Sequence, residues 1–222
     1  MTVAAIVPAA GSGQRLGGGT PKAFRLLAGT TMLRRSAEVV AGCVDSVIVA
    51  VPARWYDAAI VDLADTGCPV TVVVGGSTRQ ESVLAALAVL PPSVEIVLVH
   101  DAARPLMPSA VGVAVVAAVR AGAPAVVPAL SVTDTLKTVN TSGRVTGTVD
   151  RAGLVVVQTP QGFSREVLMR AHRAASSTAT DDAALVEALG IPVHTIPGDP
   201  AGFKITTPCD VVMAEALLGG RA

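Results

Sequence analysis

Residues 3–22 read VAAIVPAAGSGQRLGGGTPK, an apolar run that stops at Pro8 and gives way to a glycine-rich segment. The apolar run predicts a buried strand, and the segment after it has too much glycine and proline to continue as helix or strand. Glycine lets backbone N–H groups turn toward an anion and approach it closely. Arg15 and Lys22 add positive charge to the same segment. We therefore predict a phosphate-binding loop after the first strand, with an ordinary surface loop as the alternative.

The loop differs from two common nucleotide-binding motifs. A dinucleotide-binding motif has a third glycine, where this chain has Leu16, and an acidic residue about 20 positions further on. The first acidic residue of the chain is Glu38. A Walker loop has lysine directly after its last glycine and before Ser or Thr, whereas Lys22 lies between Pro21 and Ala23. The segment instead suits a triphosphate held by backbone N–H groups and two cations.

Predicted strands and helices alternate along most of the chain, and the strands are apolar almost throughout. Continuous apolarity is typical of parallel strands that are covered on both faces. We therefore predict a doubly wound α/β fold, with a mostly parallel Rossmann-like sheet and helices on both faces, as a single domain over residues 1–222. Ligands of such sheets bind beyond the carboxyl ends of the strands, where the glycine-rich loop lies. The predicted strands are Val3–Pro8, Ser46–Val51, Val70–Val74, Glu95–His100 and Ala125–Pro128, and the predicted helices are Thr31–Cys43, Ala53–Thr66, Thr78–Leu90 and Pro108–Ala121.

Two helix starts have recognisable caps. Ser77, with Gln80 three residues on, has the spacing of a capping box. Thr207 followed by Pro208 predicts the start of the last helix. After residue 153 the predicted elements are a strand Leu154–Gln158, a helix Arg165–Ala175, a helix that begins at Thr180 or Asp181, a strand Val193–Ile196, an extended segment Phe203–Thr206 and the final helix.

Residues 131–153, SVTDTLKTVNTSGRVTGTVDRAG, interrupt this alternation. Apolar and polar residues alternate roughly on either side of the polar NTSG segment, which predicts a β-hairpin. An isolated hairpin is marginally stable in water, and this one has no helix beside it in the sequence. We expect an inserted β-arm that leaves the sheet and packs on a second subunit, with a plain surface hairpin as the alternative.

The composition excludes several classes of protein. The chain has 17 basic and 17 acidic residues, which argues against nucleic acid or a membrane surface as partner. No apolar run approaches the roughly 18 residues of a membrane span, and the N-terminus lacks the basic start of a signal peptide. Cys43, Cys68 and Cys209 are widely spaced, which favours reduced thiols and argues against a metal site. We expect a cytoplasmic protein.

Further short motifs accompany the glycine-rich loop. They are GGSTRQESV (75–83), HDAARP (100–105), TDTLKTV (133–139), VDRAGLVVVQTPQGF (149–163), TDD (180–182) and FKIT (203–206). In this order, over nearly the whole chain, they resemble the motifs of the 2-C-methyl-D-erythritol 4-phosphate cytidylyltransferases of the non-mevalonate isoprenoid pathway. The resemblance implies transfer of CMP from CTP to this polyol phosphate, with release of pyrophosphate. It also implies a homodimer formed through the arm, and Mg²⁺ bound mainly through the CTP phosphates.

The resemblance also implies roles for individual residues. Arg15 and Lys22 would stabilise the transition state at the α-phosphate and the departing pyrophosphate, while Arg151 and Lys204 would position the acceptor phosphate. The residues implied in CTP binding are Ala9, Ala10, Gly11, Ser12, Gly13, Gly75, Gly76, Ser77, Ser82, Asp101 and Ala102. Those implied in binding the acceptor are Asp101, Arg104, Thr135, Arg151, Thr159, Thr180 and Lys204. No residue is implied as a protein ligand of a metal.

Purely structural roles compete with several of these assignments. Gly76 and Ser77 would also serve to begin a helix, and Thr180 would also serve as an N-cap. Asp101 follows an apolar strand, where a carboxylate needs a partner, and Arg104 would supply one through a local ion pair.

The sequence contains three histidines. We expect His100 to be structural, and His172 and His194 to be surface residues, because neither of the last two falls in a motif.

Two other functions are alternatives to the one that the resemblance implies. The first is a ribitol 5-phosphate cytidylyltransferase, whose motifs overlap strongly with these. The second is a non-catalytic nucleotide-binding domain of the same fold.

Overall fold

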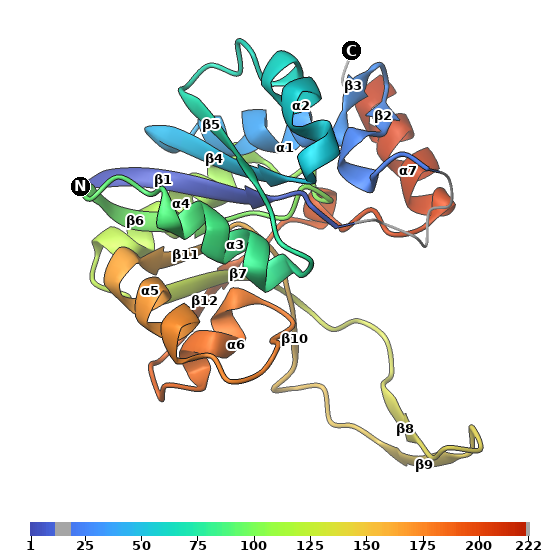
Figure 1. Ribbon diagram of the computed structural model, residues 1–222. Helices are drawn as coiled ribbons and strands as arrows, with labels where there is room; N and C mark the ends of the chain where they lie inside the picture. The colour runs from blue at the N-terminus through green and yellow to red at the C-terminus, as the bar shows by residue number, and fades with distance from the viewer. Residues whose placement is uncertain (12–18, 221–222) are drawn as a thin grey trace.

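The computed structural model describes residues 1–11 and 19–220. Within these residues an eight-stranded sheet has the order β10-β7-β11-β6-β1-β4-β5, with β12 paired along β7 (Figure 1). β1 is parallel to β4 and β6, β4 to β5, and β12 to β7, whereas β10 and β11 are antiparallel to their neighbours. The predicted doubly wound, mostly parallel α/β sheet is confirmed. Its strands are β1 (Thr2–Pro8), β4 (Ser46–Val51), β5 (Val70–Val74), β6 (Val94–Val99), β7 (Ala125–Ser131), β10 (Val155–Val157), β11 (Gln161–Ser164) and β12 (His194–Pro197).

Helices cover both faces of this sheet (Figure 1). Along β1, Val3, Ala5 and Val7 face a core shared with α1, α2 and α4, while Ala4 and Ile6 face a second core shared with α3, α5 and α6. Because alternate residues of a strand point to opposite faces, a strand that is apolar at every position buries both. The helices are α1 (Met32–Ala41), α2 (Tyr56–Asp62), α3 (Arg79–Ala88), α4 (Ser109–Arg120), α5 (Arg165–Ala174), α6 (Asp182–Glu187) and α7 (Pro208–Gly219), with 3₁₀ turns η2 (Lys22–Phe24), η3 (Ala53–Trp55) and η4 (Pro200–Gly202). The remaining strands form two small pairs, β2 (Leu26–Leu27) with β3 (Thr30–Thr31) and β8 (Lys137–Val139) with β9 (Val145–Thr148).

The segment after residue 153 contains the predicted strand and a second strand that was not predicted. β10 lies within the predicted strand Leu154–Gln158, whereas β11, which lies antiparallel between β6 and β7, was not predicted. The sequence of β11, QGFS, has no strand pattern, and it is a strand because both neighbours offer backbone groups to pair with. Its glycine is required by α4: a Cβ on Gly162 would lie 2.3 Å from Cγ1 of Val115.

The capping box of α3 is formed by Thr78 and Glu81, and not by Ser77 and Gln80 as predicted. The Thr78 side chain accepts a hydrogen bond of 3.0 Å from the backbone N–H of Glu81. The Glu81 carboxylate accepts in return from the backbone N–H groups of Ser77 and Thr78. The box therefore begins one residue later, where Glu81 rather than Gln80 completes it.

Two further helix starts decide between expected alternatives. Asp181 is the N-cap of α6, because its side chain accepts a hydrogen bond from the backbone N–H of Ala184. The alternative role of Thr180 as an N-cap is therefore wrong. Thr207 caps α7, and Pro208 occupies its first turn, as predicted.

Residues 131–153 leave the sheet as a β-hairpin that extends away from the body of the protein (Figure 1). The Asn140 side chain shapes the turn by accepting hydrogen bonds from the N–H groups of Ser142 and Arg144. Gly143 has φ 79°, a left-handed conformation that favours glycine. The predicted hairpin is confirmed, and its packing on a second subunit stays a prediction.

Candidate active site

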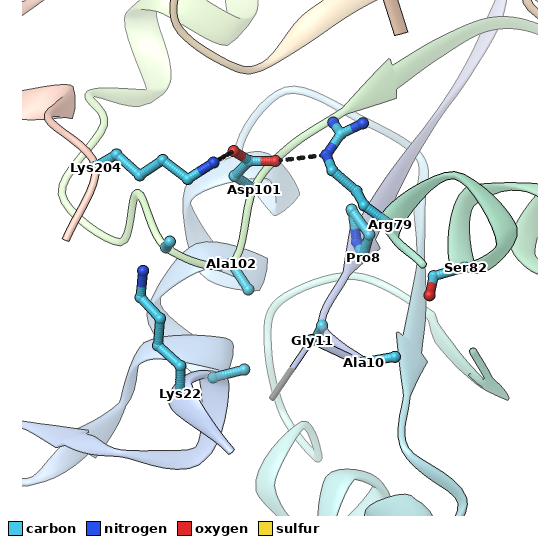
Figure 2. Close-up of a pocket in the computed structure, with 12 residues that line it drawn as sticks. Pro8, Ala10, Gly11, Lys22, Arg79, Ser82, Asp101, Ala102 and Lys204 are labelled. Carbon is cyan, nitrogen blue, oxygen red and sulfur yellow. Dashed lines mark hydrogen bonds and ion pairs between the residues drawn. The ribbon is translucent and has the colours of Figure 1, made fainter. Parts of the chain in front are cut away.

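A pocket of about 210 Å³ lies where the carboxyl ends of β1 and β6 meet the start of α3 (Figure 2). Ligands of doubly wound sheets bind at this edge, so the pocket is the candidate active site. The residues that line it are Pro8, Ala9, Ala10, Gly11, Lys22, Ala23, Arg79, Ser82, Asp101, Ala102, Ala103 and Lys204. The structure thus brings together these residues that the sequence analysis had assigned to the site: Ala9, Ala10, Gly11, Lys22, Ser82, Asp101, Ala102 and Lys204.

Gly75 lets one wall of this pocket pack closely. A Cβ on Gly75 would lie 2.7 Å from the Cβ of Ala10 and 2.8 Å from Oγ of Ser82. Both distances are shorter than van der Waals contact, so a side chain at this position requires a neighbour to move. Gly75 itself does not line the pocket, but it supports two residues that do.

Gly76 and Ser77 take part in the start of α3. A Cβ on Gly76 would lie 2.3 Å from the Cβ of Glu81. Ser77 donates to the Glu81 carboxylate from its backbone N–H at 2.7 Å and from its hydroxyl at 2.6 Å. The structural role that was weighed for these two residues is therefore present, and a contact with CTP stays a prediction.

Asp101 follows β6 and is bound on both carboxylate oxygens. Arg79 Nε donates to Oδ1 at 3.0 Å, and Lys204 Nζ donates to Oδ2 at 2.7 Å (Figure 2). The residue is 8% exposed. Burial alone would raise the pKa of Asp101, but Arg79 and Lys204 hold it well below its usual range. Asp101 is therefore a carboxylate held in one orientation by two cations.

Arg104 does not form the local ion pair with Asp101 that was weighed as an alternative. Its Nη1 donates to the carbonyl of Gly202 at 2.7 Å, and its Nη2 donates to the carbonyl of Val157 at 3.2 Å. Arg104 is buried and joins the end of β10 to the end of η4. Lys204 follows η4 by two residues. In the described structure it supports the segment that carries Lys204, and a direct contact with the acceptor stays a prediction.

Arg79 is a site residue that the sequence analysis missed. It is the first residue of α3, where a cation opposes the helix dipole. That unfavourable position was the available signal, because it calls for carboxylates nearby. Two carboxylates bind Arg79. One is Asp101, and the other is Asp182, whose Oδ2 accepts a hydrogen bond from Nη1 of Arg79 at 2.7 Å. Burial alone would lower the pKa of Arg79, but Asp182 and Asp101 raise it above its ordinary value.

His172 is buried, so the expectation of a surface residue is wrong. Its Nε2 lies 2.9 Å from Oδ1 of Asp182, which itself is 1% exposed. His172 is on α5 and Asp182 begins α6, so their contact depends on how these helices pack. The sequence contains no motif that joins the two. His194 is exposed, as expected.

His100 and Thr159 support the loop after β6 from within. His100 is fully buried, with Nε2 3.3 Å from the carbonyl of Arg104 and Nδ1 3.1 Å from Oγ1 of Thr159. Burial lowers the pKa of His100 to about 4. Thr159 also accepts a hydrogen bond from the backbone N–H of Asp101 at 3.0 Å. The structural role expected for His100 is present, and a substrate contact of Thr159 stays a prediction.

The remaining predicted residues lie away from this pocket or outside the described residues. Thr135 and Arg151 line a separate surface pocket on the arm, and the Arg151 guanidinium donates to the carbonyl of Thr133. Thr180 is exposed directly before the cap of α6. Ser12, Gly13 and Arg15 fall in the segment 12–18, which lies outside the described residues.

This geometry agrees with what comparison to other proteins finds. The profile of the 2-C-methyl-D-erythritol 4-phosphate cytidylyltransferase family matches residues 3–220. The chain belongs to this family. A protein of Nocardia farcinica named 2-C-methyl-D-erythritol 4-phosphate cytidylyltransferase is 54% identical over 223 residues, covering 100% of this chain and 96% of the relative. A relative of the same name from Rhodococcus jostii is 53% identical over 97% of this chain and 95% of its own length.

Solved structures agree with this cytidylyltransferase membership. The crystal structure of 2-C-methyl-D-erythritol 4-phosphate cytidylyltransferase from Thermus thermophilus superposes with a TM-score of 0.81 at 38% identity, covering 98% of both chains. The 4-diphosphocytidyl-2C-methyl-D-erythritol synthase of Anaerococcus prevotii gives a TM-score of 0.86 at 27% identity, covering 98% of this chain and 96% of that one. The likeness therefore extends over nearly the whole chain.

Proposed function

We propose that this protein transfers CMP from CTP to 2-C-methyl-D-erythritol 4-phosphate, forming 4-diphosphocytidyl-2-C-methyl-D-erythritol and pyrophosphate. The observation that carries the proposal is the pocket that Lys22, Arg79, Lys204 and Asp101 line together, with Arg79 and Lys204 bound to the Asp101 carboxylate. Although Arg79 also pairs with Asp182 behind the pocket, three cationic side chains line the described part of the pocket, which suits two phosphorylated substrates. Family membership and the names of the relatives supply the identity of these substrates.

In the proposed step, an oxygen of the acceptor phosphate attacks the α-phosphorus of CTP. A new P–O bond forms, the bond from the α-phosphorus to the oxygen that bridges to the β-phosphate breaks, and pyrophosphate leaves with the electron pair. Such a reaction needs little covalent help, so orientation and neutralisation of charge supply most of the rate. Lys22, at the end of the glycine-rich loop, is assigned the charge on the α-phosphate and pyrophosphate, together with Arg15.

Lys204 is assigned the acceptor phosphate. Its side chain is 44% exposed, and its ammonium group lies 2.7 Å from Asp101. An ammonium group has three N–H donors, so Lys204 is able to hold Asp101 and a phosphate oxygen together. Asp101 in turn has further lone pairs to accept from a hydroxyl of the ribose or the polyol. The pair therefore serves both to place the incoming phosphate and to orient a sugar-like hydroxyl.

The small residues of the pocket wall are assigned the cytosine. Ala10 and Ser82 line the pocket and pack on Gly75, so a flat base can approach the backbone there. Backbone donors and acceptors that pair with the exocyclic amine of cytosine lose a partner when UTP is bound instead. The proposal thus includes selectivity for CTP over UTP.

Magnesium is proposed as an ion that arrives with the nucleotide. Within residues 1–11 and 19–220, no group of three or more His, Cys, Asp or Glu side chains is arranged to hold a metal. The carboxylate that lines the pocket, Asp101, has both oxygens engaged by cations. The described residues therefore suit a Mg²⁺ ion whose ligands come mainly from CTP phosphates and water, where the ion would neutralise phosphate charge.

A homodimer is proposed through the arm. The arm and the neighbouring edge strand β10 expose apolar side chains, with Val139 59%, Val145 55% and Val156 51% exposed. Exposed valines on a protruding hairpin favour burial against another chain. Thr135 and Arg151 lie together on the arm and outside the pocket of their own chain. In a two-fold dimer they would complete the acceptor site of the partner.

The cellular location is proposed as the cytoplasm. Cys43, Cys68 and Cys209 form no disulfide. No helix in the part of the chain that the structure describes is long and apolar enough to cross a membrane. The substrates assigned to the pocket are soluble phosphorylated metabolites, which are available there.

Release of pyrophosphate tests the proposed function. The protein is incubated with CTP and Mg²⁺ and with 2-C-methyl-D-erythritol 4-phosphate, ribitol 5-phosphate or no acceptor. We expect release only with methylerythritol phosphate. Equal release with ribitol phosphate would favour the alternative cytidylyltransferase, and no release with either acceptor would favour a non-catalytic nucleotide-binding domain.

A further inference from the structure

A continuous line of hydrogen bonds joins the acceptor side of the pocket to the helices beneath it. From the pocket inward, Lys204 binds Asp101, Asp101 binds Arg79, Arg79 binds Asp182, and Asp182 binds His172, at 2.7, 3.0, 2.7 and 2.9 Å. Asp182 and His172 have side chains that are only 1% exposed and do not line the pocket. The proposed function assigns them no role.

We propose that Asp182 and His172 are positioning residues for the transfer reaction, which act by fixing Arg79 and, through it, the carboxylate of Asp101. The proposal rests on the proposed function of the pocket. Neither residue lines the pocket, and the ion pair of Asp182 with Arg79 joins them to a residue that does.

The geometry around Arg79 is the first argument. Its guanidinium is planar and rigid, and it binds two different carboxylates through two different nitrogens, Nε and Nη1. Fixing Nη1 on Asp182 therefore fixes where Nε points. Nε holds Oδ1 of Asp101, and Lys204 holds Oδ2. Loss of the Asp182 anchor would free the guanidinium to rotate and, with it, one of the two contacts that orient Asp101.

The charge balance is the second argument. Asp101 and Asp182 carry two negative charges, and Arg79 and Lys204 carry two positive ones. Burial alone would raise the pKa of Asp182, whereas the hydrogen bond from His172 and the charge of Arg79 lower it. Asp182 is thus kept as an anion inside the protein, where an unpaired carboxylate is costly. Its two oxygens are used by two different elements, α3 and α5.

The role of His172 follows from this arrangement. Because Asp182 accepts, Nε2 of His172 donates the hydrogen bond, which holds the carboxylate so that its other oxygen faces Arg79. A glutamine at 172 reaches about as far with an N–H donor, while a leucine fills similar space without one. These two substitutions separate the hydrogen bond from the packing.

Steady-state kinetics give the first test. We expect Asp182→Asn to lower kcat at least about tenfold and to raise KM for methylerythritol phosphate, with KM for CTP changed by less than about threefold. His172→Leu should act in the same direction, and His172→Gln should recover most of the activity. Thr66→Val is the matched control, since it removes a buried hydrogen bond to Leu63 outside the pocket. A loss of kcat no larger than that of the control at equal thermal stability would overturn the proposal.

A double-mutant cycle separates positioning from general destabilisation. If Asp182 acts through Arg79 on Asp101, adding Asp182→Asn to Asp101→Asn costs little further activity. Losses in kcat that multiply in the double variant would show that the two residues act independently, and the proposal would be wrong. Absence of any transfer by the wild-type protein would instead refute the proposed function.

A measurement without turnover tests the positioning directly. In ¹H–¹⁵N spectra, the Nε–H of Arg79 should exchange slowly with water in the wild type, because it is bound to Asp101. In Asp182→Asn we expect this exchange to be at least about tenfold faster. In the Thr66→Val control, the exchange of the Arg79 Nε–H should stay at the wild-type rate. An unaltered Arg79 signal in Asp182→Asn would contradict the proposal whatever the activity of the enzyme.

Discussion

Lys204 and Asp101 form an ion pair of 2.7 Å across 103 positions of the chain. Asp101 lies two residues after the end of β6, and Lys204 lies in the segment between η4 and α7. Arg104 holds that segment by donating to the carbonyl of Gly202. The pair is thus produced by the fold, and it places an ammonium group and a carboxylate side by side in the lining of the pocket.

Removal of the lysine should affect the acceptor more than the nucleotide. We expect Lys204→Ala to raise KM for methylerythritol phosphate about tenfold or more, because a charge-assisted contact to phosphate is lost. KM for CTP should change by less than about threefold. Initial rates with each substrate varied in turn measure both constants. Arg54→Ala removes an exposed cation from η3 and serves as control; equal shifts in both constants would contradict the assignment.

Removal of Lys22 should affect the chemical step. Because Lys22 is assigned to charge that develops in the transition state, Lys22→Ala should lower kcat at least about 10²-fold with the fold intact, and Arg15→Ala should do the same. Single-turnover rates and circular dichroism check this. A variant that keeps near-native kcat and loses only CTP affinity would show that its role is ground-state binding.

The glycine behind the pocket wall gives a steric prediction. Gly75→Ala places a Cβ 2.7 Å from Ala10 and 2.8 Å from Ser82 Oγ, so the wall must shift into the nucleotide site. We expect KM for CTP to rise at least about tenfold. Gly219→Ala is the matched control, because a Cβ there meets nothing within 4 Å. An unchanged KM for CTP in Gly75→Ala would place the base elsewhere.

His100 should make stability depend on pH. Its pKa is lowered from 6.5 to about 4 by burial, so between these values the unfolded chain binds a proton that the folded protein does not. Stability supplied by the neutral ring is therefore fully present above about pH 6.5 and falls as the pH drops toward about 4, by roughly 2–4 kcal/mol.

Urea unfolding at a series of pH values measures this effect. The stability difference between wild type and His100→Gln should narrow as the pH falls through that window. His194→Gln, at an exposed histidine, is the control and should show no such narrowing. A difference that stays constant from about pH 7 to about pH 4.5 would contradict the assignment to His100.

The proposed exchange of arms predicts complementation between inactive variants. In a dimer of one Arg151→Ala subunit and one Lys22→Ala subunit, one active site carries both substitutions and the other carries neither. With random exchange about half of the dimers are mixed, so activity should recover to about a quarter of wild type. Tagging one partner verifies that subunits have exchanged. Verified mixed dimers that remain inactive would mean that Arg151 serves its own chain.

The sequence predicts the parts of the site that lie at strand ends. Asp101 directly follows an apolar strand, and Lys22 follows the glycine-rich loop, so the pattern of parallel strands already placed them at one edge. Arg79, Asp182 and His172 were not connected by the sequence, because their contacts depend on how α3, α5 and α6 pack on the sheet. The same limit applies to β11, whose strand conformation is set by its two neighbours and not by its residues.

Isotope tracing follows the proposed attack of the acceptor phosphate on the α-phosphorus of CTP. Methylerythritol phosphate with ¹⁸O in its phosphate is incubated with CTP and Mg²⁺, and the products are examined by ³¹P NMR and mass spectrometry. We expect unlabelled pyrophosphate and a product whose bridging oxygen is ¹⁸O, so that both of its phosphorus signals show an isotope shift. Label in the pyrophosphate, or a cytidine-side phosphorus without a shift, would show that the acceptor phosphate does not attack the α-phosphorus of CTP.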